Sequence, residues 1–87
     1  MINFKFSKCD KFTYKALAQY ECQTSQQISN TIKRLYGEAF SPNSVGASLR
    51  KMESVGVAAS SLNEKSQKVY WITEFGAVRA KDFEVTE

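Results

Sequence analysis

Apolar residues recur at intervals of three and four positions along the first half of the chain, the spacing that gathers them on one face of a helix. The first such segment starts after residues 7–10, which have the character of a turn, and runs to about Tyr20 or Cys22. Asp10 can cap the free backbone N–H groups of its first turn. Its apolar stripe comprises Phe12, Ala16, Leu17 and Tyr20.

A second helix is predicted from Thr24 or Ser25, because either hydroxyl can accept a hydrogen bond from the backbone of a first helical turn. Gly37 is expected to stop it, since glycine tolerates the left-handed conformation found at helix ends. Lys33 and Arg34 suit the negative end of the helix dipole, so they are assigned to that structural role. The buried stripe comprises Ile28, Ile32 and Leu35, with Tyr36 beside it.

A third helix is predicted over residues 42–55, with clear signals at both ends. Ser41 caps it, and Pro42 takes the first helical position, where a missing N–H removes no hydrogen bond. Gly56 ends it. Gly46 disfavours the helix by about 1 kcal/mol relative to Ala, which suggests close packing against the second helix or close approach of another backbone. The buried stripe comprises Val45, Leu49, Met52 and Val55.

A β-prone segment follows at once. Residues 57–61 and 68–73 are predicted as two strands, joined by polar turn formers at residues 62–67. One of the two aromatic side chains in the second strand is expected to pack on the third helix. Val69, Trp71 and Thr73 share one face of that strand, and Tyr70 and Ile72 share the other.

Both ends of the chain carry shorter patterns. Residues 1–6 alternate between apolar and polar, like a half-buried strand that could pair with the ribbon, pack on the core or meet a second copy. A short helix capped by Thr73 is expected near the C-terminus. Phe75, Val78 and Phe83 can then cover the core.

These elements describe one α+β domain over residues 1–87, with its core at about residues 10–83. A three-helix core followed by a two-stranded wing is the arrangement of a winged helix-turn-helix, and most such domains bind double-stranded DNA. The recognition helix would be residues 42–55, in the major groove, and the wing residues 57–73, on the backbone. The predicted function is that of a sequence-specific DNA-binding transcriptional regulator.

The outward side chains of the third helix supply candidate DNA contacts. Asn can bond adenine through two hydrogen bonds, Ser can bond several bases, and Ala can touch a thymine methyl. Arg50 and Lys51 are assigned to phosphates, as are Lys65 and Lys68 at the wing tip. An equally simple interpretation is that these residues form a helix face and a hairpin tip that contact only solvent. The candidate base contacts are Asn43, Ser44, Ala47 and Ser48.

Charge is distributed unevenly along the chain. The net charge is +3, with ten basic and five acidic residues through Thr73, and two basic and four acidic residues after it. The basic excess therefore lies with the candidate DNA-reading segment. A solvated surface of mixed charge would also show a difference of this size between the net charges of the two parts of the chain.

Several chemistries are excluded by what the sequence lacks. It has no His and only two cysteines, Cys9 and Cys22, without a CxxC pair, so zinc sites and disulfide frameworks are not expected. It has no Gly-rich phosphate loop and no nucleophile with a base partner, so no enzyme activity, cofactor or metal is expected. No stretch approaches the roughly 20 apolar residues of a membrane span, and no signal peptide is apparent, which indicates a reducing cytoplasm and no membrane.

Three motifs stand out in the sequence: TSQQIS at 24–29, LRKMESVGV at 49–57, and VYWITEFGAVRA at 69–80, with its LTE-x-G-like helix start. Over about residues 12–80 they resemble those of winged-helix regulators of the MarR, PadR and ArsR kinds. The resemblance implies base contacts from Asn43, Ser44, Ser48 and Lys51, and phosphate contacts from Arg50, Lys65 and Lys68. The sequence lacks the Arg-rich wing tip, an Arg in the first turns of the recognition helix, and the long flanking helices of those families. Its size would suit a small phage-like or plasmid-like regulator.

A second class of function stays open, because winged helices also serve as protein-interaction modules. The mild net charge and three aromatic side chains expected at the surface favour it: Tyr36, Phe40 and Tyr70. A polymerase subunit, another regulator or a host factor could be the partner. A homodimer is also open, through residues 1–6 or the last helix.

Overall fold

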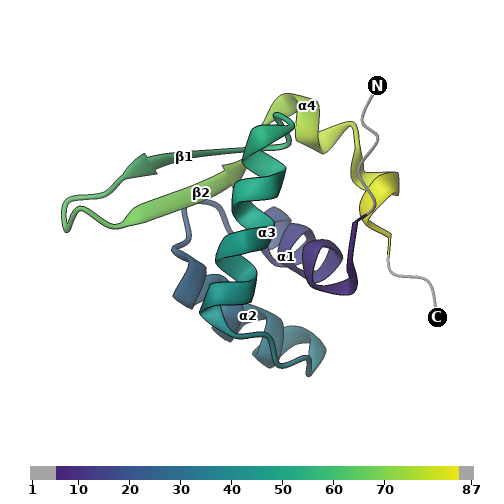
Figure 1. Ribbon diagram of the computed structural model, residues 1–87, viewed down its shortest axis with the longest axis horizontal. Helices are drawn as coiled ribbons and strands as arrows, with labels where there is room; N and C mark the ends of the chain where they lie inside the picture. The colour runs from purple at the N-terminus through teal and green to yellow at the C-terminus, as the bar shows by residue number, and fades with distance from the viewer. Residues whose placement is uncertain (1–5, 85–87) are drawn as a thin grey trace.

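The computed structural model describes residues 6–84, so the strand expected over residues 1–6 lies outside the described residues, apart from Phe6. Figure 1 shows the long helices packed around one core, with a two-stranded ribbon extending to one side. This is the α+β winged helix-turn-helix layout that the sequence predicted. The elements are α1 (Lys8–Gln19), α2 (Ser25–Tyr36), α3 (Pro42–Ser54), β1 (Ala58–Leu62), β2 (Lys68–Ile72), α4 (Glu74–Ala77) and the 3-10 turn η1 (Ala80–Phe83).

The core lies between α1, α2, α3 and the base of the ribbon. Within the described residues, no helix combines the length and apolar character needed to cross a membrane. The largest fully buried side chains are Phe83, Leu17, Ile28, Ile32, Leu49, Met52, Val45, Val57 and Thr13.

α1 begins earlier than the sequence predicted. Ser7, and not Asp10, is the N-cap: the Ser7 hydroxyl accepts a hydrogen bond from the Asp10 N–H at 3.2 Å. The Asp10 carboxylate accepts one from the Ser7 N–H at 2.9 Å. The two residues form a reciprocal capping box. The turn expected at residues 7–10 is therefore wrong, because Lys8, Cys9 and Asp10 already belong to the first helical turn.

α2 and α3 begin and end close to where the sequence predicted. Thr24 caps α2, and Gly37 ends it with a φ of 70°. Ser41 caps α3, and Gly56 follows its last turn with a φ of 81°. The buried face of α2 differs in one place, since Leu35 is exposed; Thr31 is buried on the same helix.

The ribbon is antiparallel, with Ala59 opposite Trp71 and Ser61 opposite Val69. Its inward face carries Tyr70, which is buried in the core. One aromatic side chain of β2 thus packs inward, but β2 lies mainly against α1 and α2, and not against the third helix as the sequence predicted. Tyr70 is therefore not the exposed aromatic contact that the protein-interaction hypothesis requires.

Gln23 adds a short bridge to the free edge of β2. Its backbone pairs with that of Tyr70 through N···O distances of 3.2 and 2.9 Å. Its side chain is buried, and Nε2 donates to the carbonyl oxygens of Ala16 and Tyr20. Oε1 accepts a hydrogen bond from the Thr31 hydroxyl at 2.9 Å. One residue therefore joins the end of α1, the middle of α2 and the ribbon.

The last predicted helix is divided into two short turns. Thr73 caps α4, as expected, and η1 follows and carries Phe83. The Phe83 ring is buried and stacks on Tyr14, with ring centroids 4.3 Å apart. Phe75 and Val78 were expected to cover the core as well, but they are 46% and 78% exposed. That part of the prediction is wrong, because a helix of four residues buries only one side against β2.

Gly76 lies where α4 meets the chain leaving α3. A Cβ at this position would be 2.1 Å from the carbonyl oxygen of Val57, far inside van der Waals contact. The Tyr14 hydroxyl donates to the Gly76 carbonyl at 2.8 Å, and burial raises the pKa of this phenol. α4 can therefore close against the core only because position 76 has no side chain.

Candidate nucleic-acid interface

The outer face of α3 presents one row of exposed side chains, spaced by four, three and four residues. This spacing places them along one side of a helix with 3.6 residues per turn. Ser44 is also exposed, although its hydroxyl accepts a hydrogen bond from that of Ser41 at 3.1 Å. The row, which we call the α3 row, consists of Asn43, Ala47, Arg50 and Ser54.

Ser48 and Lys51 do not belong to this face. Ser48 is only 5% exposed, and its hydroxyl lies 3.4 Å from Sγ of Cys9. The Lys51 Nζ lies 2.8 Å from Oδ2 of Asp10. Both side chains therefore point at the start of α1. The expectation that they face outward is wrong, because the first turn of α1 covers this side of α3.

Asp10 carries the buried charge of this contact, since its side chain is 4% exposed. Burial favours the neutral carboxyl group, but hydrogen bonds from Lys51, Ser48 and Ser7 outweigh it. The net effect lowers the pKa of Asp10 below its usual 3.8. A charged, hydrogen-bonded contact thus fixes the middle of α3 to the start of α1.

Arg50 belongs to the α3 row, between Ala47 and Ser54. Among the described residues it forms no hydrogen bond or ion pair. A Cβ built at Gly46, one turn earlier, would lie 3.5 Å from its Nη1. The close contact with α2 that Gly46 suggested is not found, because no atom of α2 lies within 4 Å of a Cβ built there.

The base of the wing, which is the ribbon β1–β2 with its connecting turn, is tied to α3 by Glu53. The Ser60 hydroxyl donates to Oε2 of Glu53 at 2.7 Å, and Nζ of Lys68 lies 3.6 Å from Oε1. Lys68 is therefore beside α3 and not at the wing tip. Glu53 therefore orients the wing relative to α3. A phosphate at Lys68 would compete with this carboxylate.

Lys65 is the cation at the wing tip, where it is exposed. The turn beneath it is ordered by Asn63, whose Oδ1 accepts hydrogen bonds from the backbone N–H groups of Lys65 and Gln67, both at 2.9 Å. Ser66 completes the turn with a φ of 59°. The tip is thus a defined turn that presents one basic side chain.

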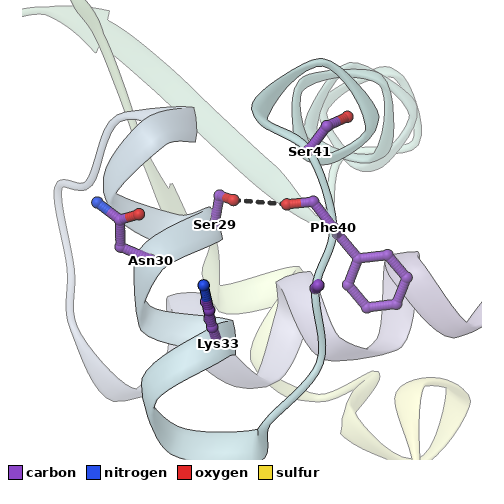
Figure 2. Close-up of a pocket in the computed structure, with 6 residues that line it drawn as sticks. Ser29, Asn30, Lys33, Phe40 and Ser41 are labelled. Carbon is purple, nitrogen blue, oxygen red and sulfur yellow. Dashed lines mark hydrogen bonds between the residues drawn. The ribbon is translucent and has the colours of Figure 1, made fainter.

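A cleft of ≈ 310 Å³ separates α2 from the start of α3. In Figure 2 the Ser29 hydroxyl donates to the Phe40 carbonyl, which fixes the connection between the two helices. Lys33 lies at this cleft, while the Phe40 ring points away from it. The sequence interpretation assigned Lys33 to the helix dipole alone. Its spacing of one helical turn from Ser29 could have indicated that it lies beside the start of α3.

The other two aromatic side chains expected at the surface are partly covered. Tyr36 and Phe40 pack on Phe12, with ring centroids 5.4 and 6.1 Å from it. They form part of the rim of the core and not a free apolar surface. The large exposed apolar side chains near the C-terminal end lie on and after α4 instead: Phe75 and Val78.

No family model and no curated protein matches this sequence. Solved structures share its fold. A MarR family transcriptional regulator from Silicibacter pomeroyi superposes with a TM-score of 0.76 at 8% identity, covering 90% of this chain and 49% of that one. A PadR family transcription regulator from Clostridium difficile R20291 gives 0.72 at 19% identity, covering 86% and 81%. Streptococcus pneumoniae FabT in complex with DNA gives 0.67 at 16% identity, covering 83% and 48%.

At these identities the comparison establishes the fold. The chain has the winged-helix fold of MarR and PadR family regulators, two of the three kinds that its motifs resemble. It spans about half the length of the MarR family chain and of FabT.

Proposed function

We propose that this chain binds double-stranded DNA in a sequence-specific manner and regulates transcription, with α3 in the major groove and the wing on the adjacent backbone. The observation that carries the proposal is the α3 row. It presents an amide at Asn43, a methyl group at Ala47 and a guanidinium at Arg50, and these groups match the chemistry of base edges in the major groove. A structural neighbour, Streptococcus pneumoniae FabT, was solved in complex with DNA, which supports DNA as the ligand.

Cations on two sides of the α3 row suit phosphate contacts. Lys65 is carried outward by the wing, which extends away from α3 in Figure 1. Lys33 lies beside the start of α3, at the cleft of Figure 2. Lys68 is a weaker candidate because Glu53 already engages it, and Lys51 is engaged by Asp10.

Binding to a labelled random duplex, followed by fluorescence anisotropy at several salt concentrations, tests the proposal. We expect an affinity that falls steeply with salt, because phosphate contacts release counterions. Lys65→Ala should weaken binding to every sequence and reduce the slope of log affinity against log salt by about one. Lys81→Ala removes the same charge from η1 and should leave the slope unchanged. No binding at low salt and micromolar protein would refute the proposal; equal effects of both variants would refute the role of the wing tip.

A homodimer contact is a second candidate function, favoured by the exposed pair Phe75 and Val78. Charges of both signs lie beside this pair, since the Arg79 guanidinium is 5.8 Å from the Phe75 ring and 2.7 Å from Asp82. A surface with both signs can complement a second copy of itself across a two-fold axis.

Sedimentation velocity tests the homodimer. We expect the parent protein to dimerise at high micromolar concentration and Val78→Asp to shift it to monomer, because a buried carboxylate would lack a partner. Leu62→Asp places the same charge on an apolar side chain of β1 that is also exposed, and should leave the dimer intact. A parent protein that stays monomeric throughout would remove this candidate without affecting the DNA-binding proposal.

A further inference from the structure

Arg50 bends back along α3. A Cβ at Gly46 would lie 3.5 Å from Nη1 of Arg50, and within the described part of the chain no atom of another element comes within 4 Å of that position. Helical side chains lean toward the N-terminus of their helix, so residue 50 covers the surface above residue 46. The missing side chain at Gly46 leaves a shallow seat for the guanidinium.

The seat lies in the half of α3 from which recognition helices contact bases. Gly46 is next to Ala47 and one turn after Asn43, so the guanidinium is brought toward the base-reading part of the α3 row. The backbone of Arg50 is in the C-terminal half of α3, but its guanidinium lies closer to the N-terminal half. Arg50 thereby brings a guanidinium toward the first turns of the helix, where the sequence itself has no Arg.

The guanidinium is also chemically available. Neighbouring cations are engaged within the protein, Lys51 by Asp10 at 2.8 Å and Lys68 by Glu53 at 3.6 Å. Arg50 has no such partner among residues 6–84, so its five N–H donors are free for a ligand. A planar fork of donors matches the O6 and N7 acceptors of guanine.

We propose that Arg50 reads a guanine in the major groove and that Gly46 seats its guanidinium for this contact. The inference rests on the proposed DNA-binding function and replaces the phosphate contact that the sequence suggested for Arg50. Phosphates line the walls of the groove, beside the helix, whereas the seat at Gly46 adjoins Ala47 and Asn43, which belong to the row that would face its floor. Arg50 is thus a determinant of specificity as well as a positive charge.

Selection of bound sequences from a random duplex pool tests the inference, with the parent protein, Arg50→Ala and Arg50→Gln compared at one salt concentration. The parent should enrich a motif with one strongly required guanine. Arg50→Ala should lose preference at that position alone, by roughly tenfold to a hundredfold. Arg50→Gln should change the preferred base there to adenine, because a glutamine amide pairs with adenine N6 and N7. The side chain is exposed, so circular dichroism should show unchanged folding for both variants.

The outcomes separate the two proposals. A parent protein that enriches no motif and shows no salt-dependent binding overturns both. A parent motif that Arg50→Ala and Arg50→Gln reproduce unchanged, with weaker affinity for all sequences, overturns the guanine contact and leaves DNA binding intact. Replacing the selected guanine by 7-deazaguanine, which lacks the N7 acceptor, should weaken the parent and not Arg50→Ala.

Position 46 provides a matched pair of variants. Gly46→Ala should keep the guanine preference, because its Cβ would meet Nη1 at an ordinary contact distance of 3.5 Å. Gly46→Met fills the seat and should weaken the same preference that Arg50→Ala abolishes. Equal motifs from Gly46→Met and the parent would show that the seat is not needed.

Discussion

Gly76→Ala is expected to destabilise the domain by about 3 kcal/mol, because overpacking against backbone cannot be relieved by moving a side chain. The added Cβ would lie 2.1 Å from the Val57 carbonyl oxygen. That oxygen also accepts hydrogen bonds from the N–H and hydroxyl of Thr73, at 3.0 and 3.1 Å. Any shift that relieves the clash therefore disturbs the cap of α4. Urea unfolding followed by circular dichroism measures the loss.

Gly46→Ala is the control for this substitution, since it makes the same chemical change in α3. A Cβ there meets only the flexible end of Arg50, so the usual helix preference should dominate and stabilise the domain by about 1 kcal/mol. The two substitutions should thus change the free energy of unfolding in opposite directions. Changes of the same sign and size would mean that α4 does not pack against Val57 as described.

Lys51→Met is expected to cost about 3 kcal/mol near neutral pH, because it leaves the Asp10 carboxylate buried without its cation. Lys8→Met is the control. The Lys8 ammonium lies 3.2 Å from Glu38, but this pair is at the surface, and its loss should change stability by less than about 1 kcal/mol. Similar effects of the two substitutions would show that the Asp10–Lys51 contact is no stronger than a surface pair.

The same contact gives stability a defined pH dependence. The pKa of Asp10 is lower in the folded protein than in the unfolded chain, where it is about 3.8. At a pH between these two pKa values, the unfolded state binds more protons than the folded state, so lowering the pH favours unfolding. The stability that Asp10 contributes is therefore present above about pH 4 and is lost as the pH falls through the folded pKa. Unfolding measured from pH 7 to acid should show this loss in the parent. The Asp10→Asn variant has no titratable carboxyl group at this position, so its stability should lack that part of the decrease at low pH.

Local signals predicted the helix boundaries well, because caps depend on neighbouring residues. Ser41 with Pro42, and the glycines at 37 and 56, act within one turn of the chain and end the helices as expected. At the start of α1 the sequence prediction placed the cap at Asp10, whereas the structure has it at Ser7. The pair is reciprocal, so each residue alone is a plausible cap, and only the backbone geometry decides which one lies outside the helix.

The candidate site was predicted less completely, because helical periodicity does not show what covers each side of a helix. Lys51 follows Arg50 directly, and the sequence prediction assigned both side chains to phosphates. Because Lys51 is one position further around the helix than Arg50, its side chain faces Asp10, which is far away in the chain. Ser48 is buried for the same reason. The link through Glu53 and the seat at Gly46 also depend on contacts that no spacing rule contains.

The wing of this domain is not a portable module. A β-hairpin alone is only marginally stable in water, and the free edge of this one pairs with Gln23, a residue from the other half of the chain. Gln23 in turn holds the end of α1 and the hydroxyl of Thr31 on α2. The hairpin and the helices therefore fold as one cooperative unit. A chimaera that transplants residues 57–73 onto another helix pair would have to bring a partner for the free edge of β2 with it.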